Sequence, residues 1–201
     1  GHCPRLSVLE DGEILLIDPS PAMLELAVKT VGDVYSPSLI KTANCRIEAL
    51  SDHLNDRYDV ALAALSYHHM PWDKKLFHLE RLRPYFDHFT IFELDANNDL
   101  PELHTPELAL SVYQSYGSMI DFIFEHDAPV EVALACVDCF LMTEEVSLLT
   151  QERGVRNDYH MLRNQWHEAF QTGLGQDFAC LCDSVCYDDD HMNLFTMHYG
   201  R

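Results

Sequence analysis

The first half of the chain alternates short apolar runs with amphipathic segments. Residues 14–17 are four consecutive apolar residues, and residues 58–65 form a longer run that is apolar except for Asp59. Continuous apolar runs of this length are typical of strands buried in a parallel sheet. The pattern predicts two more strands, over residues 44–50 and 88–94. Because helical segments separate these strands, the sequence indicates an α/β protein with a parallel sheet.

Local signals mark where the first helices begin and end. Ser20 is a good N-cap and Pro21 a good first helical residue, and Gly32 stands where this helix is expected to stop. A second helix is predicted from Asp73, and Pro84 is expected to end it before the strand over 88–94.

From residue 95 onward the pattern becomes mainly helical. Thr105, Pro106 and Glu107 supply an N-cap, a first-turn proline and an acid, and they open an amphipathic helix. Further helices are predicted over about 129–149 and 158–170. Two strands, over 178–187 and 192–199, then form an antiparallel hairpin around an acidic turn. We therefore expect a helical insertion, or cap, followed by a terminal hairpin.

The net charge of the chain disfavours some classes of binding partner. Thirteen basic and 33 acidic residues give a formal net charge of −20. Such a field repels nucleic-acid backbones and anionic lipid, and no apolar run is long enough to span a bilayer. We expect a cytoplasmic protein that binds small neutral or cationic molecules, with neither nucleic acid nor membrane as a partner.

Neither the cysteines nor the acidic runs predict a metal site. The seven cysteines have irregular spacings and read as reduced thiols. Cys180, Cys182 and Cys186 share one face of a strand, but their spacing matches no structural zinc signature. The acidic run 188–190 lacks the alternating ligands of a calcium loop, so we expect no metal.

Asp18 is the first candidate for a functional residue. An acidic residue at the carboxyl end of a parallel strand is placed to bind both hydroxyls of a ribose, in NAD or in another adenosyl cofactor. Residues 16–27 and 57–70, the second ending in His68-His69, resemble the second and fourth strands of class I S-adenosylmethionine-dependent methyltransferases. The order of the remaining elements is also similar to that family, apart from the helical insertion.

The resemblance implies a Rossmann-like, mostly parallel sheet with a C-terminal antiparallel hairpin and a helical cap. It divides the chain into a cofactor-binding part over 1–94, the helical insertion over 95–175 and the completing hairpin over 176–201. It also places seven residues at S-adenosylmethionine: Asp18 at the ribose, Pro19 and Met23 beside the adenosine, Glu48 and Ala49 at the adenine edge, and Ala64 and Leu65 at the methionine part.

One departure from the family concerns cofactor binding. The family's first strand and glycine-rich loop have no counterpart ahead of residues 14–17. That loop lets the backbone approach the cofactor closely. We therefore expect the 201-residue chain by itself to bind S-adenosylmethionine poorly.

Methyl transfer from a sulfonium depends mainly on alignment, so a general base is optional. For a hydroxyl acceptor, His68, His69 or His160 is a candidate base, since imidazole titrates near neutral pH. The alternative role is structural hydrogen bonding for His68 and His69, which is favoured for His69, and a surface or cap position for His160. Four aromatic residues are candidates for acceptor contact, with core packing as the alternative: Tyr67, Tyr113, Tyr159 and Trp166.

The leading hypothesis is a methyltransferase that acts on an oxygen or nitrogen of a small metabolite. The alternatives are a methyltransferase-like binding module without catalysis and, with less support, an NAD-dependent oxidoreductase. The helical insertion is expected to select the acceptor, and homodimer formation through it is the competing role.

Overall fold

The computed structural model describes residues 12–125, 129–153, 155–156, 159–188 and 193–201. The chain divides into two compact units, residues 1–57 and 58–201. The boundary predicted at residue 94 lies inside the second unit. No helix among the described residues is both long and apolar enough to cross a membrane.

The first unit contains two parallel strands and one helix. Strand β1 (Ile14–Ile17) pairs in parallel with β2 (Ile40–Ala43), and α1 (Pro21–Gly32) connects them. The predicted bounds of β1 and α1 are confirmed. Ser20 is the N-cap, and its side chain accepts a hydrogen bond from the N–H of Met23 at 3.4 Å.

The predicted strand over 44–50 is wrong. The strand ends at Ala43, and the Asn44 side chain donates a 3.0 Å hydrogen bond to the carbonyl of Asp18. Residues Ile47–Asp52 then form a 3₁₀-helix. The side-chain bond of Asn44 thus competes with further strand pairing, a usual property of this residue type.

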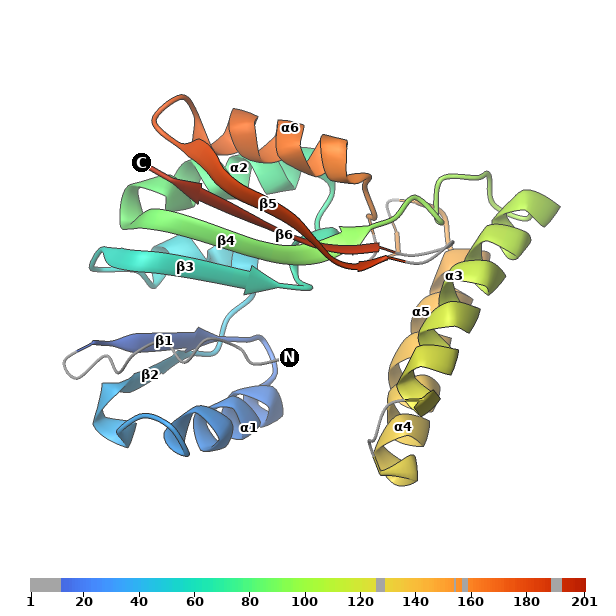
Figure 1. Ribbon diagram of the computed structural model, residues 1–201, viewed down its shortest axis with the longest axis horizontal. Helices are drawn as coiled ribbons and strands as arrows, with labels where there is room; N and C mark the ends of the chain where they lie inside the picture. Colours follow the sequence, from blue (N-terminus) through green and yellow to red (C-terminus); the bar gives the residue numbers. More distant parts are fainter. Residues whose placement is uncertain (1–11, 126–128, 154, 157–158, 189–192) are drawn as a thin grey trace. The chain divides into compact units, whose positions relative to one another are not determined.

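The second unit is built on a four-stranded sheet in the order β3-β4-β6-β5 (Figure 1). Strands β3 (Tyr58–Ala64) and β4 (Phe86–Asp95) are parallel. Strand β6 (Asn193–Gly200) is antiparallel to both β4 and β5 (Ala179–Asp188), so the predicted terminal hairpin is confirmed. In the described residues, two strand pairs are parallel and two are antiparallel, because β6 lies between β4 and β5. The proportion of parallel pairs is therefore lower than predicted.

Helices α2 (Trp72–Leu82) and α6 (Arg163–Leu174) cover one face of this sheet (Figure 1). Trp166 and Phe170 of α6 stack with ring centroids 5.9 Å apart and are fully buried. Phe170 also lies 5.4 Å from Phe89 of β4 and 5.7 Å from Tyr199 of β6, centroid to centroid. Helix α6 therefore belongs to the core of the sheet layer, although the sequence grouped it with the helical insertion.

Two helix starts differ from their predictions. The predicted start of α6 at residue 158 lies outside the described residues, but residues 159–162 are not helical and α6 begins at Arg163. Gln165 accepts the backbone N–H of Leu162 at 2.9 Å, which caps this end. Helix α2 begins at Trp72 behind Pro71, so Asp73 lies in its first turn and is not its cap.

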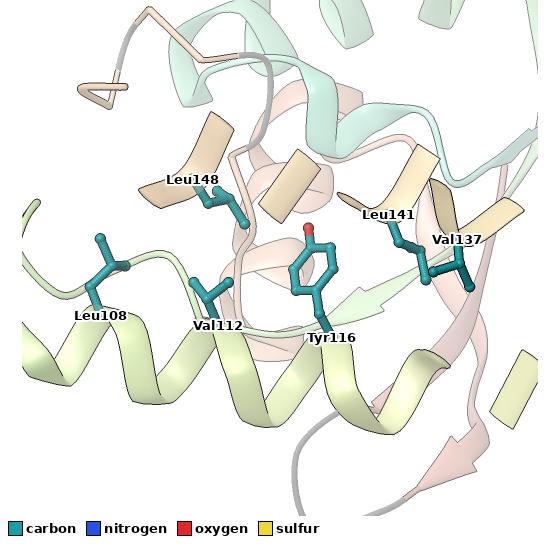
Figure 2. Packing of buried hydrophobic residues seen from close by; sticks show 6 residues of the cluster. All are labelled: Leu108, Val112, Tyr116, Val137, Leu141 and Leu148. Carbon is teal, nitrogen blue, oxygen red and sulfur yellow. The ribbon is translucent and has the colours of Figure 1, made fainter. Parts of the chain in front are cut away.

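The remaining helices form an antiparallel pair, here called the helical arm: α3 (Pro106–Glu125), α4 (Val130–Cys136) and α5 (Met142–Thr150). A π-helical turn over Val137–Leu141 joins α4 to α5. Thr105 caps α3 by accepting the N–H of Leu108 at 3.2 Å, as predicted. Figure 2 shows the buried seam between the two halves of the arm, made by Leu108, Val112, Tyr116, Val137, Leu141 and Leu148.

Candidate functional site

A buried carboxylate lies where β3 and β4 end. Glu93 of β4 has no exposed surface, and its Oε1 accepts the backbone N–H groups of Ser66 and Tyr67 at 2.9 and 2.7 Å. Its Oε2 accepts a 2.8 Å hydrogen bond from His68 Nδ1. Because the two strands are parallel, the turn after β3 meets the end of β4, and Glu93 binds that turn.

These hydrogen bonds decide the ionisation of Glu93. Burial acts to raise the pKa of the carboxyl, but the neighbouring His68 and the backbone N–H groups of Tyr67 and His68 outweigh it and hold the pKa below its usual value. Glu93 is therefore a carboxylate at neutral pH, and it can balance a positive charge on His68.

The turn after β3 begins at Leu65, which has an unusual backbone conformation. Its φ is 47°, in the left-handed region that favours glycine, and its N–H donates to the carbonyl of Phe92 at 2.8 Å. A branched residue in this region stores roughly 1–2 kcal/mol of strain. The strained residue directly precedes the N–H groups that Glu93 binds.

The structure brings the two predicted histidines together. The rings of His68 and His160 are nearly parallel, at 20°, with centroids 5.5 Å apart, and each residue is 4% exposed. The backbone N–H of Tyr159 donates to the carbonyl of His68 at 2.7 Å, which joins the two segments directly. The ring of His69 lies 4.0 Å from that of His68.

A second buried carboxylate lies beside His160. Asp99 Oδ1 is 4.0 Å from His160 Nδ1, and Oδ2 accepts a 3.0 Å hydrogen bond from the buried Arg156. Arg153 lies 3.6 Å from the same oxygen. Each histidine of the pair thus has its own buried acid, Glu93 for His68 and Asp99 for His160.

Lys75 ties the two histidine segments together from α2. Its buried ammonium donates to the carbonyl of Met70 and, at 3.1 Å, to that of Tyr159. The same group lies 4.8 Å from the centroid of the Trp166 ring. Burial lowers the pKa of Lys75 to about 8. The amine therefore fixes the spacing of the loops that carry the histidine pair.

The four predicted acceptor residues have different surroundings. Tyr67 is 1% exposed, and its hydroxyl pairs with His78 Nδ1 at 2.9 Å. Trp166 is fully buried and donates to the carbonyl of Leu94 at 3.0 Å, so these two side chains are part of the core. Tyr159 is half-buried beside Lys75, next to the histidine pair. Tyr113 is 70% exposed on α3.

The predicted cofactor residues of the first unit lie around the end of β1. Asp18 is half-buried, and its Oδ1 accepts the N–H of Ser20 at 2.7 Å. Pro19 and Met23 are exposed near the start of α1. Glu48 is exposed and Ala49 half-buried, but both belong to the 3₁₀-helix, so the strand-end position expected for Glu48 is wrong.

The remaining predicted cofactor residues belong to the second unit. Ala64 is the last residue of β3, and Leu65 follows it with 42% of its surface exposed. The described residues hold no group of three or more His, Cys, Asp or Glu side chains that could bind a metal ion.

Sequence reasoning missed the residues that organise the histidine pair, namely Glu93, Lys75, Asp99 and Arg156. A signal for Glu93 was present. Phe89 and Ile91 alternate on the buried face of β4, and Glu93 continues that alternation as a charged residue. The others come from loops and a helix face, where no spacing indicates burial.

The chain was compared with protein family models, with curated proteins and with solved structures. No protein family model and no curated protein matches the sequence. Among solved structures, a possible exported protein from Bordetella parapertussis is 13% identical with a TM-score of 0.53; the alignment covers 94% of this chain and 53% of that one. Magnesium protoporphyrin IX methyltransferase (ChlM) from Synechocystis PCC 6803, solved with bound SAH, is 12% identical with a TM-score of 0.51, covering 94% and 64%.

A putative O-methyltransferase from Nostoc punctiforme PCC 73102 is also similar, with 13% identity, a TM-score of 0.49, and coverage of 92% and 44%. The chain thus spans between 44% and 64% of the length of these proteins. The likeness to ChlM supports a methyltransferase-like α/β fold. Identity this low shows the fold alone.

Proposed function

We propose that the protein takes part in S-adenosylmethionine-dependent methyl transfer to an oxygen or nitrogen of a small metabolite, with His68 as the base when the acceptor is a hydroxyl. The observation that carries the proposal is the 2.8 Å hydrogen bond from His68 Nδ1 to Glu93. This bond keeps the proton on Nδ1 and leaves Nε2 as the acceptor nitrogen. An imidazole held in this way is suited to remove a proton.

The proton balance of such a reaction is simple. S-adenosylmethionine, when bound, supplies a methyl group on a sulfonium that becomes a neutral thioether. The acceptor oxygen forms the new bond to the methyl carbon, and its proton passes to His68 Nε2. The Glu93 carboxylate then faces an imidazolium, which it stabilises more strongly than the neutral ring. The stacked ring of His160 restricts rotation of His68.

Asp18 fits the proposed cofactor by its chemistry. Its carboxylate lies at the carboxyl end of a parallel strand, the usual place for an acid that binds ribose hydroxyls. The hydrogen bond from the Ser20 N–H orients this carboxylate, while the residue keeps part of its surface exposed. We assign the ribose to Asp18, with Pro19 and Met23 beside the adenosine.

The test uses the full-length gene product, labelled S-adenosylmethionine and a panel of hydroxyl- and amine-bearing metabolites. We expect methyl transfer with at least one acceptor. For a hydroxyl acceptor, His68→Gln should lower turnover by about 100-fold or more while cofactor affinity is kept. His69→Gln, a change at the exposed neighbouring ring, is the matched control and should keep most of the activity.

Other results would point elsewhere. Cofactor binding without transfer to any acceptor would favour a methyltransferase-like binding module. Binding of NAD in place of S-adenosylmethionine would favour the oxidoreductase. Equal losses in the His68 and His69 variants would remove the assignment of the base.

A further inference from the structure

The helical arm has a second apolar stripe besides its seam. On α3, positions 110, 113, 117, 120 and 124 repeat at spacings of three and four residues. Leu110, Tyr113 and Phe124 are 57%, 70% and 46% exposed, and Ile120 is half-buried. Since successive residues of a helix turn by about 100°, Tyr113 and Ile120 lie beside Val112 of the seam, Ile120 packing against it, while Leu110 lies nearly opposite Leu108.

The other half of the arm carries a matching stripe. Exposed apolar side chains occur on α4 at Val130 and Leu134, and on α5 at Met142 and Val146. Seen along each helix from its N-terminus, the exposed side chains of both halves lie on the same rotational side of the seam residues. Because the two halves run antiparallel, this places both stripes on the same side of the arm. We call this surface the outer face.

The opposite side of the arm has a different character. On α3 it presents Ser111 and Ser118, and the ring of Phe122 lies 5.1 Å from that of Tyr187 of β5, centroid to centroid. Where α3 begins, next to the seam, an open hollow of about 480 Å³ is lined by His104, Thr105, Pro106, Leu108, Ala109 and Leu149. Contiguous exposed apolar surface of this kind marks interaction sites.

The charge of the arm selects the chemistry of its partner. Residues 106–150 contain eight Asp or Glu residues and no Lys or Arg. Asp121, Glu131 and Asp138 are exposed and border the outer face by their helical positions. A second copy of the chain would bring the same negative charge against this surface. A cationic partner would instead meet opposite charges around an apolar surface.

We propose that the outer face of the helical arm binds a basic amphipathic helix of another protein. An exposed apolar surface accepts the apolar side of such a helix through anchors spaced three and four residues apart. The partner's Lys or Arg residues pair with the acidic border, which makes binding sensitive to salt. This site is separate from the histidine pair, and the proposal does not depend on methyl transfer.

The test uses the full chain and a synthetic probe peptide of about 18 residues, or five helical turns, made of Leu and Lys in an amphipathic pattern. A scrambled peptide of the same composition controls for general attraction to an acidic protein. Fluorescence anisotropy should show binding of the amphipathic peptide at least tenfold tighter than the scrambled one. Added salt should weaken the binding of both peptides.

Two matched variants locate the surface. Val146 and Val132 are 54% and 57% exposed and undergo the same change to serine, but Val132 points to the opposite side of the arm. Val146→Ser should weaken binding of the amphipathic peptide several-fold, and Val132→Ser should leave it unchanged. Circular dichroism and thermal melts confirm that both variants stay folded.

Three results would overturn the proposal: equal binding of the two peptides, equal effects of the two variants, or self-association. Light scattering tests the last one. A dimer of the wild-type chain that Val146→Ser dissociates and Val132→Ser does not would assign the outer face to a second copy instead.

Discussion

His68 Nδ1 and Glu93 Oε2 are 2.8 Å apart, although 25 residues separate them in the sequence. The other oxygen of Glu93 binds the backbone N–H groups of Ser66 and Tyr67. One carboxylate therefore shapes the turn after β3 and orients the imidazole on it. A change at Glu93 should affect both the turn and the protonation of His68.

Glu93→Gln tests this double role. The amide oxygen can still accept the backbone N–H groups, but the amide nitrogen must donate to His68 Nδ1. The proton of the neutral ring then moves to Nε2, which ¹⁵N NMR of the imidazole detects. For a hydroxyl acceptor we expect turnover to fall by about 100-fold or more. Glu80→Gln, at an exposed position of α2, is the control and should change neither readout.

Lys75 gives a prediction for alkaline pH. The pKa of Lys75 is about 8 in the folded protein and 10.5 for a lysine side chain in water, so the unfolded chain binds more protons between these values. Folding stability should therefore rise with pH from about 8 to 10.5, by on the order of 3 kcal/mol at most. Urea unfolding across this window measures the effect. Lys75→Met should lose this contribution; an identical pH profile for both proteins would contradict it.

Leu65 should tolerate glycine unusually well. Its φ of 47° favours glycine, so Leu65→Gly relieves strain of roughly 1–2 kcal/mol and offsets the usual entropic cost of glycine, about 0.5–1 kcal/mol. Leu62→Gly, at a more exposed residue inside β3, gains no such relief. We expect the free energy of unfolding of Leu65→Gly to exceed that of Leu62→Gly by about 1 kcal/mol. The opposite order would show that Leu65 is not strained.

Gly173 should not accept even a methyl group. A Cβ at this position would lie 2.7 Å from Leu79 Cβ, where α6 approaches α2. Gly173→Ala should therefore lower the free energy of unfolding by about 1–3 kcal/mol. At Gly117 of α3 a Cβ meets nothing within 4 Å, so Gly117→Ala should raise stability by about 0.5–1 kcal/mol. Thermal melts of the two variants should move in opposite directions.

Elements with strong local signals could be predicted from the sequence. The cap Ser20-Pro21 and the stop at Gly32 define α1, and Thr105-Pro106 defines the start of α3. The start of α6 was missed because the N-cap position holds Leu162, which no cap preference selects. The N-terminal end of α6 is capped by Gln165, whose side-chain oxygen accepts a backbone N–H. A cap of this kind has only a weak sequence signature.

The candidate site was predictable only in part. His68 follows a clear strand and belongs to the resemblance with methyltransferases, whereas only the titration range of imidazole points to His160. Their stacking depends on backbone contacts such as that of the Tyr159 N–H with the His68 carbonyl. Long-range contacts of this kind leave no periodic pattern. Trp166 fits a helical stripe equally well as core or as pocket lining, and the structure places it in the core.

The π-helical turn over Val137–Leu141 sets the rotational phase of the second half of the arm. Val137 and Leu141 of the turn and Leu148 of α5 all pack in the seam. Because each residue turns a helix by about 100°, deleting a single residue here would rotate α5 by that angle and move Leu148 away from the seam. Insertions or deletions in this turn would therefore change what the arm presents to a partner without altering any surface residue.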